Sequence, residues 1–177
     1  MPGQAVDVTL KGKPVTLIGD PVNVGQKAPH FVVCDHDLTS VPFCSLGKGP
    51  FVISSVLSLD TEVCDREARR FNEEAAALDP DLGILVISMD LPFAQKRWCG
   101  QAGSHQVQTL SDHRDASFGT SYGVLIRDLR LLARACFVVD AAGIICHKEI
   151  VSEAADEPDY EALFETVRQL TGGARSA

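Results

Sequence analysis

The strongest constraint on the fold is an apolar run over residues 51–57 that leads, after a short connection, into a helical pattern. The run predicts a strand buried in a sheet. Beyond the connection, apolar side chains recur at intervals of three and four residues, at Cys64, Ala68, Phe71, Ala75 and Leu78. This spacing predicts a helix over residues 64–78 with one face turned to the core. The two elements form a β-α unit.

The connection places a cysteine at the start of this helix. Thr61 lies three residues before Cys64, where a helix N-cap is expected. Cys64 then lies in the first turn, where the positive end of the helix dipole stabilises a thiolate, the nucleophilic form of cysteine. The alternative is that Cys64 is a small apolar core residue, and position alone does not separate the two. The nearby acids Asp60, Glu62 and Asp65 would disfavour a thiolate if they pointed inward, so we expect them to face solvent.

Length and composition favour one soluble domain, which we assign to residues 1–177. Of the 177 residues, 45% are hydrophobic and 23% charged, which is ordinary for a globular chain. The net charge of −8 argues against a nucleic-acid partner. Because no apolar run approaches the length of a membrane span and no signal peptide is visible, we expect a cytoplasmic protein that does not enter a membrane.

The six cysteines do not form a pattern that identifies their roles. They lie at positions 34, 44, 64, 99, 136 and 146, and three structural disulfides would be typical of a small secreted chain. No Cys-x-x-Cys is present, so neither a zinc knuckle nor a thioredoxin-type dithiol is indicated. Asp35, His36 and Asp37 beside Cys34 could form an adventitious metal site, but a polar loop is the favoured interpretation.

The rest of the chain predicts further strands and helices. Alternation over residues 6–18, interrupted by a turn at 11–14, predicts an N-terminal hairpin. Helices are expected at 93–99, stopped by Gly100, and at 116–122. A last helix should begin at Pro158, and residues 171–177 should form a flexible tail. Strands are expected at 31–34, 84–88, 106–110, 134–140 and 144–150, the last two joined as a hairpin.

Four segments together resemble a known family. The Thr-x-x-Cys pattern of Thr61 and Cys64 is similar to the active-site motif of peroxiredoxins, and residues 58–64 resemble that motif in the thiol peroxidase subfamily, the atypical two-cysteine type. Residues 90–100, 133–135 and 157–162 resemble, in order, the subfamily's resolving-cysteine segment, arginine strand and C-terminal helix start. The resemblance implies an α/β, thioredoxin-like fold with an N-terminal hairpin.

The resemblance also implies a function and its residues. The chain would be a thiol peroxidase that reduces hydrogen peroxide and organic hydroperoxides without a metal or other cofactor. Cys64 would be the peroxidatic thiolate, Thr61 would orient the peroxide, and Arg134 would stabilise the developing negative charge. Cys99 would be the resolving cysteine, which forms a transient disulfide with Cys64. Thioredoxin would reduce that disulfide, and the chain would form a homodimer.

Each of these assignments has a structural alternative. Arg134 could be a surface strand residue in an ion pair, Thr61 a plain N-cap and Cys99 a core cysteine at a helix end. Cys136 lies two residues after Arg134 on the same side of a strand, near the active site or packed in the core. Cys34, Cys44 and Cys146 are expected to be bystanders.

One departure from the family keeps other functions open. Peroxiredoxins usually have proline four residues before the motif threonine, where this chain has Leu57, which can shield the cysteine but cannot fix the backbone angle φ. A peroxide-responsive redox sensor or relay with poor turnover is therefore one alternative. A protein disulfide oxidoreductase is another, although the lack of Cys-x-x-Cys argues against it.

Overall fold

A seven-stranded mixed sheet forms the centre of the computed structural model, which describes residues 7–172. Its inner strands β6, β7 and β8 are parallel, and the strands on either side of them run antiparallel to their neighbours. In spatial order the strands are β12 (Ile145–Ile150), β11 (Ala135–Val139), β6 (Phe51–Ser55), β7 (Gly83–Ser88), β8 (Val107–Ser111), β4 (Val32–Cys34) and β5 (Ser40–Pro42).

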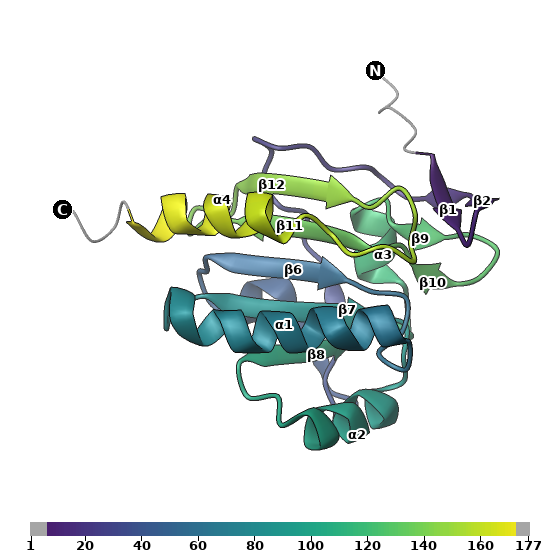
Figure 1. The fold of residues 1–177 in the computed structure, drawn as a ribbon, viewed down its shortest axis with the longest axis horizontal. Coiled ribbons are helices and arrows are strands. Elements are labelled where there is room, and N and C mark those ends of the chain that lie inside the picture. Colours follow the sequence, from purple (N-terminus) through teal and green to yellow (C-terminus); the bar gives the residue numbers. More distant parts are fainter. Residues whose placement is uncertain (1–6, 173–177) are drawn as a thin grey trace.

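Helices cover both faces of this sheet, and the sheet separates the hydrophobic core into two layers. On one face, α1 (Glu62–Leu78) and α4 (Tyr160–Gly172) lie side by side, and α2 (Pro92–Ala102) packs beside β8 (Figure 1). The opposite face carries α3 (Ser117–Ser121), which contacts β4, and a short 3₁₀ helix, η1 (Phe43–Leu46). Every residue of β6 is buried, as expected for a strand covered on both faces. The mixed α/β sheet and its helices confirm the predicted fold class.

Most of the predicted elements are present within one or two residues of their expected bounds. The helix expected at 64–78 begins at Glu62, with Thr61 in the N-cap position. β11 and β12 form the predicted antiparallel hairpin. The predicted last helix, α4, begins at Tyr160 and packs one face into the core, with Leu163 and Val167 fully buried.

The N-terminal hairpin is smaller than predicted. β1 (Val8–Leu10) pairs with β2 (Lys13–Val15), so Lys13 and Pro14 belong to a strand and only the two residues between the strands form the turn. The expected second arm was wrong beyond Val15: β3 (Leu17–Ile18) instead joins β9 (Leu125–Ile126) and β10 (Leu131–Leu132) in a separate small sheet. These two-residue strands are held by long-range pairing, which local alternation does not reveal.

Two predicted ends differ from the structure. Helix α2 continues through Gly100 and ends at Gly103, which adopts the left-handed conformation with φ 63°. That conformation has little steric cost for glycine, so Gly103 is the better helix terminator. The predicted tail at 171–177 is wrong for its first two residues, because α4 extends to Gly172. The remainder, 173–177, lies outside the described residues, as does Val6 of the predicted hairpin.

The sheet topology brings distant segments to one edge. Ser55 ends β6 and pairs with Ala135, the first residue of the antiparallel β11. The residues that follow β6 and the residues that precede β11 therefore lie at the same edge of the sheet. Within residues 7–172, no helix combines the length and apolar character needed to cross a membrane.

Candidate active site

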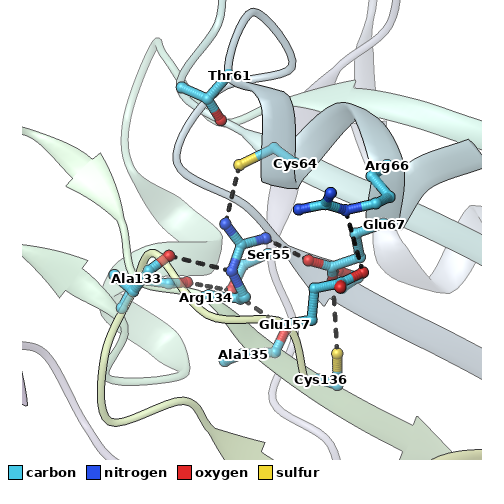
Figure 2. A network of polar contacts seen from close by, with 12 residues as sticks. Ser55, Thr61, Cys64, Arg66, Glu67, Ala133, Arg134, Ala135, Cys136 and Glu157 are labelled. Carbon is cyan, nitrogen blue, oxygen red and sulfur yellow. Dashed lines mark hydrogen bonds and ion pairs between the residues drawn. The ribbon is translucent and has the colours of Figure 1, made fainter. Parts of the chain in front are cut away.

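Cys64 lies in the first turn of α1, at the sheet edge where β6 ends. Its side chain is fully buried, and its sulfur accepts a hydrogen bond of 3.2 Å from Nη2 of Arg134 (Figure 2). The two residues are 70 positions apart in the sequence. A cysteine beside a guanidinium and at a helix N-terminus has two sources of positive potential that favour its thiolate.

Arg134 is a buried residue, so the surface ion pair considered above is not what the structure contains. Only 1% of it is exposed. Its Nε donates to the carbonyl of Ala154 at 3.1 Å, its Nη1 donates to Glu67, and its Nη2 donates to Cys64. Burial alone would lower the pKa of Arg134, but the neighbouring anionic groups, Glu67 and Cys64, raise it above its ordinary value. The guanidinium is therefore a fixed positive charge held on three sides.

Glu67 is the site residue that the sequence interpretation missed. It is completely buried, and its carboxylate is bound by Arg134 and by the hydroxyl of Ser54, which donates at 2.6 Å. Burial raises the pKa of Glu67, whereas Arg134 and the hydrogen bond from Ser54 oppose that shift. A signal was present: Glu67 lies three residues after Cys64 and four before Phe71, on the apolar face of the predicted helix.

Cys136 extends this network on its far side from Cys64. Arg134 immediately precedes β11, and its side chain and that of Cys136 both reach Glu67, on the same side as predicted; the Cys136 thiol lies 3.8 Å from Oε1 of Glu67 (Figure 2). The residue is fully buried in the core layer beneath α1 and α4. Burial, reinforced by the negative charge of Glu67, raises the pKa of Cys136 well above its usual range. Cys136 is therefore a neutral thiol at neutral pH and packs against the site.

Thr61 occupies the predicted N-cap position without making the capping bond. Its hydroxyl donates instead to the carbonyl of Ser58 at 2.8 Å, and no side chain caps the helix there. The residue is exposed above Cys64 (Figure 2). Because the proton of this hydroxyl is donated to Ser58 and its oxygen accepts no bond from an α1 amide, the oxygen can still accept a hydrogen bond from a small molecule. Leu57, at the position of the family's usual proline, is buried, with 6% exposed.

The three acids near Cys64 are paired away from its sulfur. Asp60 binds Arg97 at 3.2 Å. Glu62 lies 3.9 Å from Arg66, with 90% of its side chain exposed. Asp65 accepts hydrogen bonds from Arg69 at 2.9 Å and from the indole of Trp98 at 2.7 Å. The carboxylate that does reach the interior, Glu67, faces the guanidinium rather than the thiol.

Cys99 forms no disulfide with Cys64 in this structure. It lies in α2, half-buried, with its sulfur 3.2 Å from the hydroxyl of Thr109. Burial raises the pKa of Cys99, and the hydrogen bond with Thr109 opposes this. All six cysteines are free. The neighbouring Trp98 is buried, and its bond to Asp65 ties α2 to the first turn of α1.

The remaining cysteines lie outside this network. Cys34 is buried in β4, Cys44 is exposed in η1, and Cys146 lies in β12 near Asp140. The site therefore consists of a buried, cation-paired thiol at a helix N-terminus, with a second thiol on a neighbouring helix. Chemically, such an arrangement can perform a nucleophilic attack and stabilise the negative charge that develops on the leaving group.

Comparisons with known proteins agree with one another. The chain matches the Redoxin family over residues 23–164. It is 53% identical to a thiol peroxidase of Halalkalibacterium halodurans over 91% of this chain and 96% of that protein. It is 49% identical to a thiol peroxidase of Bacillus subtilis over 93% and 98%.

Solved structures give the same result. A peroxiredoxin-like protein from Aquifex aeolicus superposes with a TM-score of 0.86 at 40% identity, covering 94% of this chain and 98% of that one. A thiol peroxidase from Chromobacterium violaceum superposes with a TM-score of 0.84 at 26% identity, covering 98% and 100%.

Proposed function

The chain belongs to the Redoxin family and is a thiol-dependent peroxidase of the thiol peroxidase group, and from this premise we propose that Cys64 is its peroxidatic residue and Cys99 its resolving residue. The observation that carries the proposal is the hydrogen bond from the buried guanidinium of Arg134 to the sulfur of Cys64. The thiol peroxidase relatives do not favour the redox sensor or the protein disulfide oxidoreductase.

The first step is an attack by the Cys64 thiolate on the terminal oxygen of a peroxide. The O–O bond breaks, Cys64 becomes a sulfenic acid, and the other oxygen leaves as water or an alcohol after it gains a proton. Arg134 holds the thiolate and donates hydrogen bonds to the oxygens as negative charge develops. Thr61, whose hydroxyl lies free of the helix amides, orients the peroxide.

The second step regenerates the enzyme through Cys99. Its thiolate attacks the sulfenic sulfur of Cys64, a disulfide forms and water leaves. Because the two cysteines are free and lie on separate packed helices, we expect part of α1 or α2 to leave its packed position when the disulfide forms. Thioredoxin, an external dithiol, then reduces the disulfide. The resemblance to thiol peroxidases also implies a cytoplasmic location and a homodimer, and both belong to this proposal.

Steady-state turnover with thioredoxin, its reductase and peroxide tests the proposal. Cys64→Ser should abolish peroxide consumption, because a hydroxyl is not appreciably ionised at neutral pH. Cys99→Ser should retain one round of peroxide reduction but lose turnover, and its Cys64 should overoxidise to sulfinic acid. Cys44→Ser is the matched control, since Cys44 is exposed and lies outside the site, and it should turn over normally. Normal cycling by Cys99→Ser would show that another cysteine resolves the sulfenic acid.

A further inference from the structure

Cys99 is the end of a hydrogen-bonded chain that the steps above do not use. Its sulfur lies 3.2 Å from Oγ1 of Thr109, and the same oxygen lies 2.7 Å from Nε2 of His36. The three residues come from three elements: Cys99 from α2, Thr109 from β8, and His36 from the turn between β4 and β5. A thiol, a hydroxyl and an imidazole are thus connected through a single oxygen atom.

Among the arrangements of donors and acceptors that the single hydroxyl proton and the imidazole tautomers allow, two bear on the proton of Cys99. In the first, Cys99 donates its S–H to Thr109 and Thr109 donates its O–H to a neutral His36. In the second, a protonated His36 donates to Thr109 and Thr109 donates to a Cys99 thiolate. The two arrangements differ by the transfer of one proton from sulfur to imidazole. The geometry therefore provides a path by which the proton of Cys99 can reach His36.

The centre of this chain is held rigidly. Thr109 is 2% exposed and lies within β8, where it pairs with Val86 of the parallel neighbour β7. His36 lies in a turn that the carboxylate of Asp35 organises by accepting the backbone N–H groups of Asp37 and Thr39, both at 2.9 Å. The imidazole and the hydroxyl are thus positioned by separate parts of the fold before any reaction begins.

An open polar cavity of about 630 Å³ gives this chain access to solvent. Cys99, Thr109 and His36 all line it. The other titratable side chains in its wall are Asp35, Asp37 and His105, and Asp37 is paired with Lys96 of α2 at 3.2 Å. Carboxylates on both sides of His36 in the sequence can compensate a positive charge on its ring. A proton taken up by His36 can then pass to water in the cavity.

We propose that His36 accepts the proton of Cys99 through the hydroxyl of Thr109, so that Cys99 ionises in its packed position. Here Thr109 contacts the reacting sulfur and His36 is a positioning residue that acts through it. The inference rests on the proposed resolving role of Cys99. In resolution the Cys99 thiolate forms the S–S bond, the S–O bond of the sulfenic acid breaks, and the hydroxide takes a proton from solvent. The proton held by His36 returns to solvent, so the step releases one water and no net proton.

The relay should change how fast Cys99 reacts and at which pH. A thiol with an ordinary pKa of about 8.5 is roughly 3% ionised at pH 7, and burial makes an isolated Cys99 less ionised still. With a proton acceptor in the hydrogen-bonded chain, Cys99 should react faster at neutral pH than an isolated buried thiol, and its rate should depend less steeply on pH. Without it, the rate should keep rising toward the pKa of the thiol.

Alkylation of the fully reduced protein by iodoacetamide, followed at each cysteine by mass spectrometry over a range of pH, measures this directly. His36→Gln preserves a hydrogen-bonding side chain that cannot take a proton, and Thr109→Val removes the hydroxyl. Both should slow alkylation of Cys99 at pH 7, by about thirtyfold if the relay ionises the thiol completely against roughly 3% without it, and should make the rate rise with pH as steeply as that of an isolated thiol. Thr109→Ser should restore wild-type behaviour, and exposed Cys44 serves as the internal reference in every sample.

The outcomes separate the relay from the proposed function. If the rate and pH profile of Cys99 alkylation are the same in wild type, His36→Gln and Thr109→Val, the relay is wrong, whatever the turnover of Cys99→Ser shows. A faster reaction in Thr109→Val would also overturn it, because the hydroxyl would then only hold the thiol in place. If alkylation behaves as expected but Cys99→Ser cycles normally with thioredoxin, the hydrogen bonds through Thr109 do ionise Cys99, and the resolving role of Cys99 is wrong.

Discussion

Replacement of Glu67 by glutamine tests how the fold keeps a positive charge beside Cys64. The amide has the shape of the carboxylate and can still accept from Arg134 while its NH₂ group donates to Ser54, so the change removes mainly a charge. Breaking a buried ion pair so that one charge is left uncompensated typically costs 3–5 kcal/mol. Because the hydrogen bonds can be kept, we expect Glu67→Gln to lower the free energy of unfolding by about 3 kcal/mol.

The same substitution should destabilise the fold but make Cys64 more reactive. With Glu67 neutral, Cys64 is the remaining anionic partner of the guanidinium, so a larger fraction of Cys64 should be thiolate at neutral pH. Urea denaturation at pH 7 measures the loss of stability, and the rate of Cys64 alkylation measures the thiolate. Glu62→Gln is the control on the same helix, because that side chain is 90% exposed and its ion pair should contribute less than about 1 kcal/mol.

The Arg134→Met variant tests whether Glu67 compensates the charge of Arg134. In Arg134→Met the carboxylate of Glu67 is buried without its cation, so adding Glu67→Gln should now raise the free energy of unfolding rather than lower it. If Glu67→Gln destabilises both backgrounds equally, the carboxylate supports packing and does not compensate the charge of Arg134.

Three further predictions follow from the contacts. Arg134→Met should slow the peroxide step roughly ten- to hundredfold, because one charge-assisted hydrogen bond of about 1.5–3 kcal/mol is lost; an unchanged rate in stopped-flow peroxide reduction would remove Arg134 from the site. Trp98 fluorescence should change in a fast and a slow phase after stoichiometric peroxide, since disulfide formation must break the indole's bond to Asp65, and the slow phase should be absent in Cys99→Ser. Four hydrogen bonds, beginning with the one from the Gly12 amide, lower the pKa of Glu153 to about 2. The carboxylate should therefore stabilise the fold above its unfolded pKa of about 4.3 and lose this contribution as the pH falls toward 2. The free energies of unfolding of wild type and Glu153→Gln, measured during acid titration, should converge over that interval and not above it.

The sequence predicted those parts of the fold and site that depend on local pattern. The apolar run of β6 and the periodicity of α1 put Cys64 in a first helical turn, and the acids around it were expected to face outward, as they do. The resemblance of residues 133–135 to an arginine strand directed attention to Arg134, but the fact that it is buried and bound to Cys64 depends on strand pairing across the sheet.

Residues joined by long-range contacts could not be predicted in this way. Glu67 was overlooked because a charged residue within a helix is usually exposed, and its burial depends on partners outside the helix, Ser54 and, 67 positions away, Arg134. His36 was assigned to a polar loop, which it is, but its contact with Thr109 spans 73 positions. Strands of two residues such as β9 and β10 carry no periodicity at all.

The central claim, that Cys64 is oxidised by peroxide and resolved by Cys99, is tested most directly by a single turnover. Reduced protein should be mixed with one equivalent of peroxide, quenched by alkylation, digested and mapped by mass spectrometry. The account predicts one disulfide, between Cys64 and Cys99, in wild type, and a single added oxygen on Cys64 in Cys99→Ser. A disulfide that joins any other pair of cysteines, or oxidation that begins at a cysteine other than Cys64, would contradict it.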